Sequence, residues 1–184
     1  MRDAPISSQR LFFALWPDDA TRAAIVERSA AHVHAAGGRP IPPEKLHVTL
    51  AFLGGVAESH LADVRAAAGR VRATPFEMTL THVRHWRRTG LLCLQPPQVP
   101  TALATLVRTL WMPLGECGFE QDPRPYRAHV TLARDARPPR GLPNEIEPIR
   151  WTIRELSLVE SFTDQRGARY ERLQTWPLTP DNPA

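Results

Sequence analysis

The chain has 184 residues, 42% of them hydrophobic and 23% charged, a composition typical of soluble globular proteins that excludes disordered and collagen-like classes. The longest apolar runs, such as residues 11–16, are far too short to cross a bilayer, and no secretory signal pattern precedes them, so we expect a cytoplasmic protein. A net charge of +4 favours a polyanionic partner, although 22 of the 23 basic residues are arginine and so uniform a bias can also record genomic base composition.

The N-terminal part of the chain is predicted to alternate strands and helices. Residues 10–16 (RLFFALW) indicate a buried strand, and residues 17–19 (PDD) offer a turn and an N-cap for an Ala-rich helix that reaches about His34. A Gly- and Pro-rich segment ends this helix. A second strand is predicted over residues 46–53 and a second helix over residues 59–72.

The C-terminal part adds a hairpin, a helix and further strands. The hairpin pairs residues 76–83 with 91–94, and a helix over 101–114 precedes a short strand at 128–132. The remaining prediction is a Pro-rich loop over 137–148, followed by strands at 152–161 and 168–176 that are joined hairpin-fashion by residues 164–167. The lack of a strict βαβ alternation indicates an α+β fold with mainly antiparallel sheets and helices on their outer faces.

An identical pentapeptide, His-Val-Thr-Leu-Ala, occurs at residues 47–51 and again at 129–133, 82 residues apart (129 − 47). Both copies fall in segments predicted as strands. One repeat at this spacing is too little for a solenoid, so it indicates two related lobes that each contribute an equivalent strand to a shared cleft.

Each copy of the pentapeptide presents an imidazole beside a hydroxyl. Side chains two residues apart lie on one face of a strand, so His47 accompanies Thr49 and His129 accompanies Thr131, while the apolar residues between them face a core. Two imidazoles can act as general base and general acid on opposite sides of a phosphorus, and threonine hydroxyls can hydrogen-bond its non-bridging oxygens.

Metal ligation is the competing interpretation of paired histidines. A single His-x-Thr on a strand is usually a structural pair, but its repetition favours function. No Asp, Glu or Cys lies in either tripeptide, and Cys93 and Cys117 form no metal-like spacing. We therefore expect neither a metal site nor a cofactor.

The extended motifs His-x-Thr-x-x-Phe, residues 47–52, and His-x-Thr-x-x-Arg, residues 129–134, make the chain resemble the two-histidine phosphoesterases. Within them it is similar to the RNA 2′,3′-cyclic phosphodiesterases, also known as 2′-5′ RNA ligases. The resemblance extends to residues 10–14 and 170–178 and so spans nearly the whole chain.

The resemblance implies a single bilobal domain over residues 1–184, with two pseudo-symmetric lobes, each with an antiparallel sheet and outer helices, around a central cleft. It also implies metal-independent hydrolysis of an RNA terminal 2′,3′-cyclic phosphate to a 2′-phosphomonoester. The implied partner is RNA. We expect no association with a membrane, and we expect a monomer. The roles that it implies are general acid for His47, general base for His129, phosphate binding for Thr49, Thr131 and Arg134, and base stacking for Phe52.

Phe52 and Arg134 pose a geometric problem, because each lies five residues after its histidine and would project from the opposite face of a regular strand. If they share the cleft, the strand must end, twist or bulge between Ala51 and Phe52, and likewise between Ala133 and Arg134. The glycines and aspartate that follow the two motifs make early termination one way to achieve this.

Other features leave alternatives open. The basic segment of residues 82–88 (HVRHWRR), with His82, His85 and Trp86, could follow an RNA backbone, but a solvated loop or strand end is the favoured interpretation. Tyr126 and Arg127 flank the second motif without an assigned role. Alternative functions are 2′-5′ ligation by transesterification, action on small cyclic nucleotides, and RNA binding without catalysis; the physiological RNA and its required length stay open.

Overall fold

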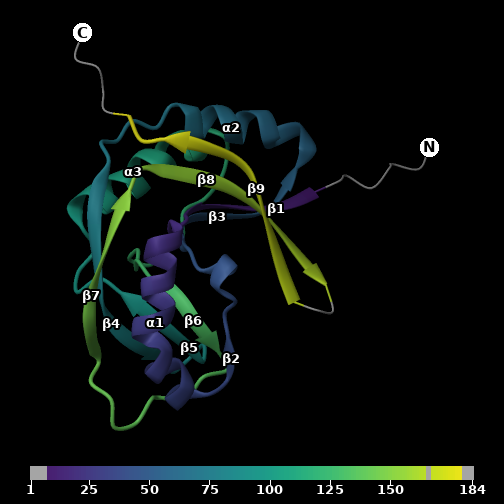
Figure 1. Ribbon diagram of the computed structural model, residues 1–184. Coiled ribbons are helices and arrows are strands. Elements are labelled where there is room, and N and C mark those ends of the chain that lie inside the picture. Colours follow the sequence, from purple (N-terminus) through teal and green to yellow (C-terminus); the bar gives the residue numbers. More distant parts are fainter. Residues whose placement is uncertain (1–7, 165–166, 180–184) are drawn as a thin grey trace.

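The computed structural model describes residues 8–164 and 167–179, which form an α+β fold (Figure 1). Its helices are α1 (Asp19–Ala36), α2 (Leu61–Gly69) and α3 (Thr101–Glu116), with short 3₁₀ turns η1 (Pro43–Lys45) and η2 (Glu58–His60). Its strands are β1 (Ser8–Leu15), β2 (Arg39–Pro40), β3 (Val48–Ala57), β4 (Phe76–Trp86), β5 (Leu91–Gln95), β6 (Val130–Arg134), β7 (Glu145–Ile153), β8 (Glu155–Asp164) and β9 (Gly167–Pro177).

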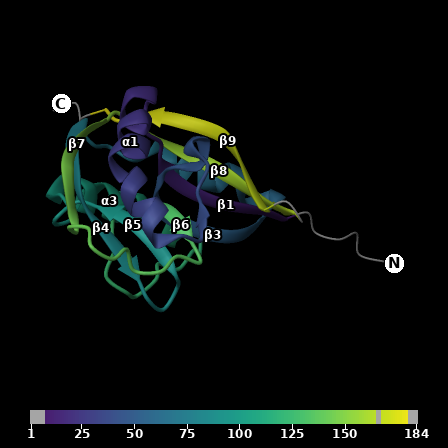
Figure 2. The same ribbon diagram turned by 60° about the horizontal axis from the view of Figure 1, so that its bottom comes forward.

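The described strands belong to one antiparallel sheet in the order β7-β4-β5-β6-β3-β1-β8-β9, with β2 added beside β6. The two halves of this sheet meet at β3 and β6, which pair only through Val48 and Val130. Because the ladder is so short there, the halves can diverge, and they form the two groups of strands seen in Figures 1 and 2. The expected antiparallel α+β fold is confirmed, and the two strand groups, called lobes below, are consistent with the expected bilobal form.

Helices α1 and α3 each pack on the half of the sheet that does not contain the strand preceding them in the chain. Helix α1 follows β1 in the chain but packs against β5, β6 and β7, whereas α3 follows β5 and packs against α2 and β3 (Figure 1). The C-terminal hairpin of β8 and β9 returns to pair with β1. Neither lobe is therefore a contiguous half of the chain.

Local sequence accounts for the boundaries of α1. The Asp18 carboxylate accepts a hydrogen bond from the backbone N–H of Thr21 at 2.7 Å, which satisfies one of the free donors at the helix N-terminus. Gly37 ends the helix with φ of +61°, a conformation that favours glycine. The cap lies within the predicted residues 17–19, and the helix ends at Ala36, before the predicted Gly-rich stop and two residues beyond its predicted end near His34.

The stretch between residues 137 and 161 differs from prediction. Strand β7 begins at Glu145, inside the predicted loop, and Arg154 separates it from β8, so the single predicted strand over 152–161 is two strands. Pro148 obscured β7 because proline is disfavoured inside sheets, but β7 is an edge strand where a missing N–H is tolerated. The short strand β2 was not predicted, and part of the predicted turn over 164–167 lies outside the described residues.

The inward faces of the motif strands are fully apolar. Val48, Leu50, Val130 and Leu132 are each no more than 3% exposed and lie in one core cluster with Ile25 of α1. This packing confirms the predicted apolar backing and holds the opposite face of both strands toward a cleft. No helix in the described part of the chain is long and apolar enough to span a membrane.

Candidate functional site: a cationic cleft with paired histidines

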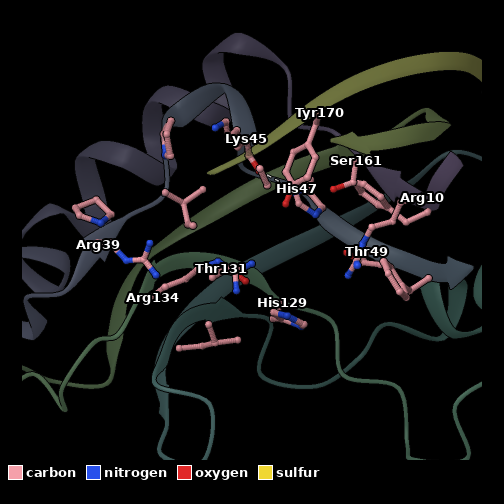
Figure 3. Close-up of a pocket in the computed structure, with 17 residues that line it drawn as sticks. Arg10, Arg39, Lys45, His47, Thr49, His129, Thr131, Arg134, Ser161 and Tyr170 are labelled. Carbon is pink, nitrogen blue, oxygen red and sulfur yellow. Dashed lines mark hydrogen bonds between the residues drawn. The ribbon is translucent and has the colours of Figure 1, made fainter. Parts of the chain in front are cut away.

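A cleft of about 540 Å³ lies where the two halves of the sheet meet (Figure 3). Side chains from both lobes line it. They include every residue predicted for the site: His47, Thr49, Phe52, His129, Thr131 and Arg134.

The two histidines are anchored in the same way. Each lies immediately before its strand rather than within it, because β3 begins at Val48 and β6 at Val130. The His47 Nδ1–H donates to the carbonyl of Lys45 at 2.7 Å, and the His129 Nδ1–H donates to the carbonyl of Arg127 at 2.8 Å. A carbonyl can only accept, so these bonds fix the tautomer and leave Nε2 of each neutral ring free to exchange protons.

Aromatic rings pack against each of the two imidazoles. The Trp16 indole stacks on His47 with ring centroids 5.0 Å apart and planes at 12°, and Phe12 and Tyr170 also contact this ring. Trp86 contacts His129 with centroids 4.5 Å apart. Sequence reasoning did not assign these tryptophans to the site, and the only signal for either was the place of Trp86 in the basic aromatic segment.

Burial shifts both histidines toward the neutral form. Desolvation lowers the pKa of His47 from 6.5 to about 4, the Lys45 carbonyl opposes this shift, and the positive charges of His129 and Arg134 reinforce it. Desolvation also lowers the pKa of His129, against the effect of the Arg127 carbonyl. These lowered pKa values favour neutral rings at neutral pH, and an anionic ligand would favour protonation.

A bulge in each motif strand brings the distant motif residue into the cleft. In the pairing of β3 with β1, Ala14 faces Thr49 and Phe13 faces Ala51, so Leu50 is an extra residue. In the pairing of β6 with β5, Leu132 is extra in the same way. Two successive residues are then buried, and Phe52 and Arg134 turn to the same side as the threonines.

The predicted distortion is thus present, but its position was wrong by one residue. The bulges at Leu50 and Leu132 lie before Ala51 and Ala133, and β3 has a second irregularity at Leu53, after Phe52. Strand β3 does not end early, since it continues to Ala57, whereas β6 does end at Arg134. Phe52 is left 50% exposed, a high value for so large an apolar side chain.

The cleft lining is strongly cationic. Arg10, Arg39, Lys45 and Arg134 line it, and no aspartate or glutamate is among the described residues that line it. The guanidinium of Arg10 lies 4.9 Å from the centre of the Phe52 ring. Such a site suits an anionic ligand that carries an aromatic group.

A hydrogen bond connects the two motifs directly. The Tyr126 hydroxyl, three residues before His129, donates to the Thr49 carbonyl at 2.9 Å. Burial raises the pKa of this phenol, which keeps it protonated and able to donate. Tyr126 is therefore a structural tie between the lobes rather than a group that faces the cleft.

The basic segment of residues 82–88 is the end of β4 and the turn that follows it, as the favoured interpretation had it. His82 lies 3.2 Å from Glu145 of β7, and the His85 Nε2–H donates to the Ala136 carbonyl at 2.9 Å. Both histidines therefore make structural contacts, and within this segment the aromatic contact to His129 is made by Trp86. Across residues 8–164 and 167–179, no three His, Cys, Asp or Glu side chains are grouped to hold a metal ion.

Comparison with known proteins gives concordant results. A family model described as the 2′-5′ RNA ligase superfamily matches residues 17–165. The RNA 2′,3′-cyclic phosphodiesterase of Escherichia coli (strain K12) is 33% identical over 171 residues, which cover 93% of this chain and 97% of that protein. The protein of the same name from Thermus thermophilus is 29% identical and is covered to 90%, with 92% of this chain. The crystal structure of E. coli LigT complexed with 3′-AMP matches with a TM-score of 0.85 at 33% identity, covering 94% of this chain and 99% of that one.

Proposed function

The chain belongs to the 2′-5′ RNA ligase superfamily, and from this premise we propose that it hydrolyses the 2′,3′-cyclic phosphate at an RNA end to a 2′-phosphomonoester. The observation that carries the proposal is the pair of histidines, anchored alike through Nδ1, that line one cationic cleft from its two sides. Relatives named RNA 2′,3′-cyclic phosphodiesterase match over nearly the whole chain and support the same activity. We take residues 1–184 to act as one bilobal domain.

The proposed reaction is an in-line displacement at phosphorus. Nε2 of His129 takes a proton from water as the water oxygen bonds to phosphorus. The bond from phosphorus to the ribose O3′ breaks, and His47 gives its Nε2 proton to O3′. The phosphate remains on O2′, and the two histidines have exchanged protonation states, which solvent then restores.

His47 must be protonated to serve as the acid, although burial lowers its pKa to about 4. A bound phosphate supplies the missing negative charge beside the ring, and opposite charge at short range raises the pKa of an imidazole. Trp16 stacks on the same ring and favours the cation through its π face. Substrate binding therefore favours the protonated form of His47 that the reaction needs.

The other cleft residues bind and orient the substrate. Thr49 and Thr131 can donate hydrogen bonds to the non-bridging phosphate oxygens, and the planar guanidinium of Arg134 can bind two of them at once. Phe52 offers an exposed ring on which the terminal base can stack, a contact that is tolerant of base identity. All of these residues come from one chain, so a monomer would carry a complete cleft.

The proposal is tested with an RNA that ends in a 2′,3′-cyclic phosphate, by identifying the phosphate isomer that is released. A 2′-phosphate is expected, and a 3′-phosphate would reverse the assigned leaving group. His47→Ala and His129→Ala should each abolish turnover, whereas His60→Ala, the same change at an exposed histidine outside the cleft, should not. Full activity of either cleft variant would remove the acid and base assignments.

Catalysis by two imidazoles needs no metal ion, so activity should persist in excess EDTA. Loss of activity on chelation, with recovery on adding back a divalent cation, would contradict the proposed mechanism. DNA ends should be inert, because a cyclic phosphate of this kind requires the 2′-hydroxyl.

A second candidate reaction is 2′-5′ ligation, which the name of the matching family favours. An RNA 5′-hydroxyl would then take the place of water at the same phosphorus. Because water is in great excess, hydrolysis should dominate unless a second strand is held in the cleft. Gel analysis of two labelled strands separates the two reactions, since only ligation yields a longer product.

A further inference from the structure

We propose that Arg39 binds the phosphate on the 5′ oxygen of the terminal nucleotide, so that the cleft selects RNA ends over isolated nucleoside cyclic phosphates. This inference rests on the proposed function and concerns a residue that the sequence did not bring forward. Arg39 belongs to β2, the short strand that sequence reasoning missed.

Arg39 lies directly opposite Arg134 in the antiparallel pairing of β2 with β6. Both side chains line the cleft, and Figure 3 shows them at the same end of it. Like charges directly opposite each other across a strand pair are destabilising. An anionic ligand between or beside the two guanidinium groups would offset that repulsion.

Asp135 orients Arg39 but leaves much of its hydrogen-bonding capacity unused. The Arg39 Nε–H donates to the Asp135 carboxylate at 2.7 Å, and one terminal nitrogen lies 2.7 Å from the same oxygen. The second terminal nitrogen has no protein partner among the described residues, and the Arg39 side chain is 77% exposed. One carboxylate against two arginines leaves this end of the cleft with a net positive charge.

The backbone around Arg39 is fixed closely against the strand that carries Arg134. Gly38 has φ of +80°, and a side chain there would meet the carbonyl oxygens of Arg134 and Asp135 at 2.3 and 2.7 Å. Asp135 itself has φ of +52°. Glycine thus permits a close approach of these two segments of the chain, which sets Arg39 and Arg134 side by side.

The covalent geometry of a ribonucleotide indicates which phosphate reaches this end. The base leaves the ribose at C1′ and the 5′ carbon leaves at C4′, on the other side of the ring, with the 2′ and 3′ oxygens on the edge between them. If the base stacks on Phe52 and the cyclic phosphate lies between the histidines, the 5′ oxygen points away from Phe52. Figure 3 places Arg10, whose guanidinium covers Phe52, and Arg39 at opposite ends of the cleft, with the histidines between them.

The other cleft cations are less suited to this role. Arg10 lies at the end of the cleft where the base would stack. The Lys45 carbonyl holds His47, which places this residue next to the reacting phosphate rather than beyond it. Arg39 is the cation at the far end that is not already assigned to the cyclic phosphate.

The test compares three substrates by kcat/KM: a nucleoside 2′,3′-cyclic phosphate, the same molecule with a 5′-phosphate, and a dinucleotide that ends in the cyclic phosphate. A charge-assisted hydrogen-bonded contact should favour the second and third substrates over the first by about tenfold or more. Arg39→Ala should remove most of this preference, and Arg39→Lys should retain part of it. The preference should also decline as salt concentration rises.

Arg108→Ala is the matched control, because it removes the same charge from an exposed position on α3 outside the cleft. It should leave the preference intact. Circular dichroism of the Arg39 variants verifies that they fold, and Arg39→Gln offers a milder change if Arg39→Ala does not.

Four results would overturn the inference. The wild type could show no preference for a 5′-phosphate; the preference could survive in Arg39→Ala or Arg39→Gln; or it could vanish in Lys45→Ala instead. A gain for the dinucleotide alone would indicate recognition of the second nucleoside, which also contradicts a phosphate site. If none of the substrates is hydrolysed, the proposed function itself fails, and that outcome is distinct from equal hydrolysis of all three.

Discussion

The substitution Gly38→Ala tests whether the close approach behind Arg39 and Arg134 positions the cleft. The added Cβ would lie 2.3 Å from the Arg134 carbonyl oxygen and 2.7 Å from that of Asp135, well inside van der Waals contact. Both obstacles are backbone atoms, so relief requires movement of β2 or of the end of β6. A shift of about 1 Å near a reacting group can cost about 100-fold in rate.

Gly37→Ala provides the matched control for this substitution. Gly37 also has a positive φ, +61°, but nothing lies within 4 Å of a Cβ built there. Both variants should lose about 1–2 kcal/mol of unfolding free energy because alanine is strained in this conformation. Only Gly38→Ala should incur an additional steric cost, and only it should displace Arg134.

The assay combines urea unfolding with kcat/KM on an RNA that ends in a cyclic phosphate. We expect Gly38→Ala to lose on the order of 100-fold in kcat/KM, and Gly37→Ala to stay close to the wild type once folded protein is corrected for. Equal activity in the two variants would refute the inference that the Gly38 contact positions the site. Equal losses of stability would refute the steric part of the reasoning.

Further predictions concern groups around the motifs. Because the folded-state pKa of His47 is lowered from 6.5 to about 4, the unfolded chain binds more protons between these values, and stability should fall as pH drops through this window. Urea midpoints should show this loss, and His47→Gln should reduce it. Trp16→Leu and Trp86→Leu should each lower kcat/KM by up to about tenfold, the value of one aromatic contact. Because Trp16 contacts the proposed acid His47 and Trp86 the proposed base His129, the two variants should move different limbs of the pH profile of kcat/KM. Movement of the same limb by both would contradict separate roles for the two histidines. Tyr126→Phe should cost about 1 kcal/mol of stability by removing the donor to the Thr49 carbonyl, and an unchanged urea midpoint would argue against the tie between lobes.

Prediction from sequence was most successful where local chemistry decides the outcome. The Asp18 cap and the Gly37 stop depend on hydrogen bonds and dihedral preferences within a few residues, so the bounds of α1 could be predicted from sequence. Strand β7 could not be predicted, because Pro148 argues against a strand unless that strand is known to lie at the edge of a sheet. Edge position is a property of the whole fold.

The same distinction between local and tertiary effects applies to the candidate site. The repeated His-x-Thr pattern determined by itself which imidazoles and hydroxyls share a strand face, since the period of a strand is a local property. Sequence also indicated that each strand must be distorted before the last residue of its motif, but the register with β1 and β5 decided that Leu50 and Leu132 are the bulged residues.

Contacts between distant segments were decided by the tertiary structure alone. Trp16 stacks on His47 from 31 residues away (47 − 16), Trp86 contacts His129 from 43 (129 − 86), and Arg39 faces Arg134 across a two-residue strand. No periodicity links such positions, because their proximity results from how the two halves of the sheet pack together. The sequence by itself therefore determined the chemical groups of the cleft, and only the packing of the lobes determined what surrounds, orients and charges them.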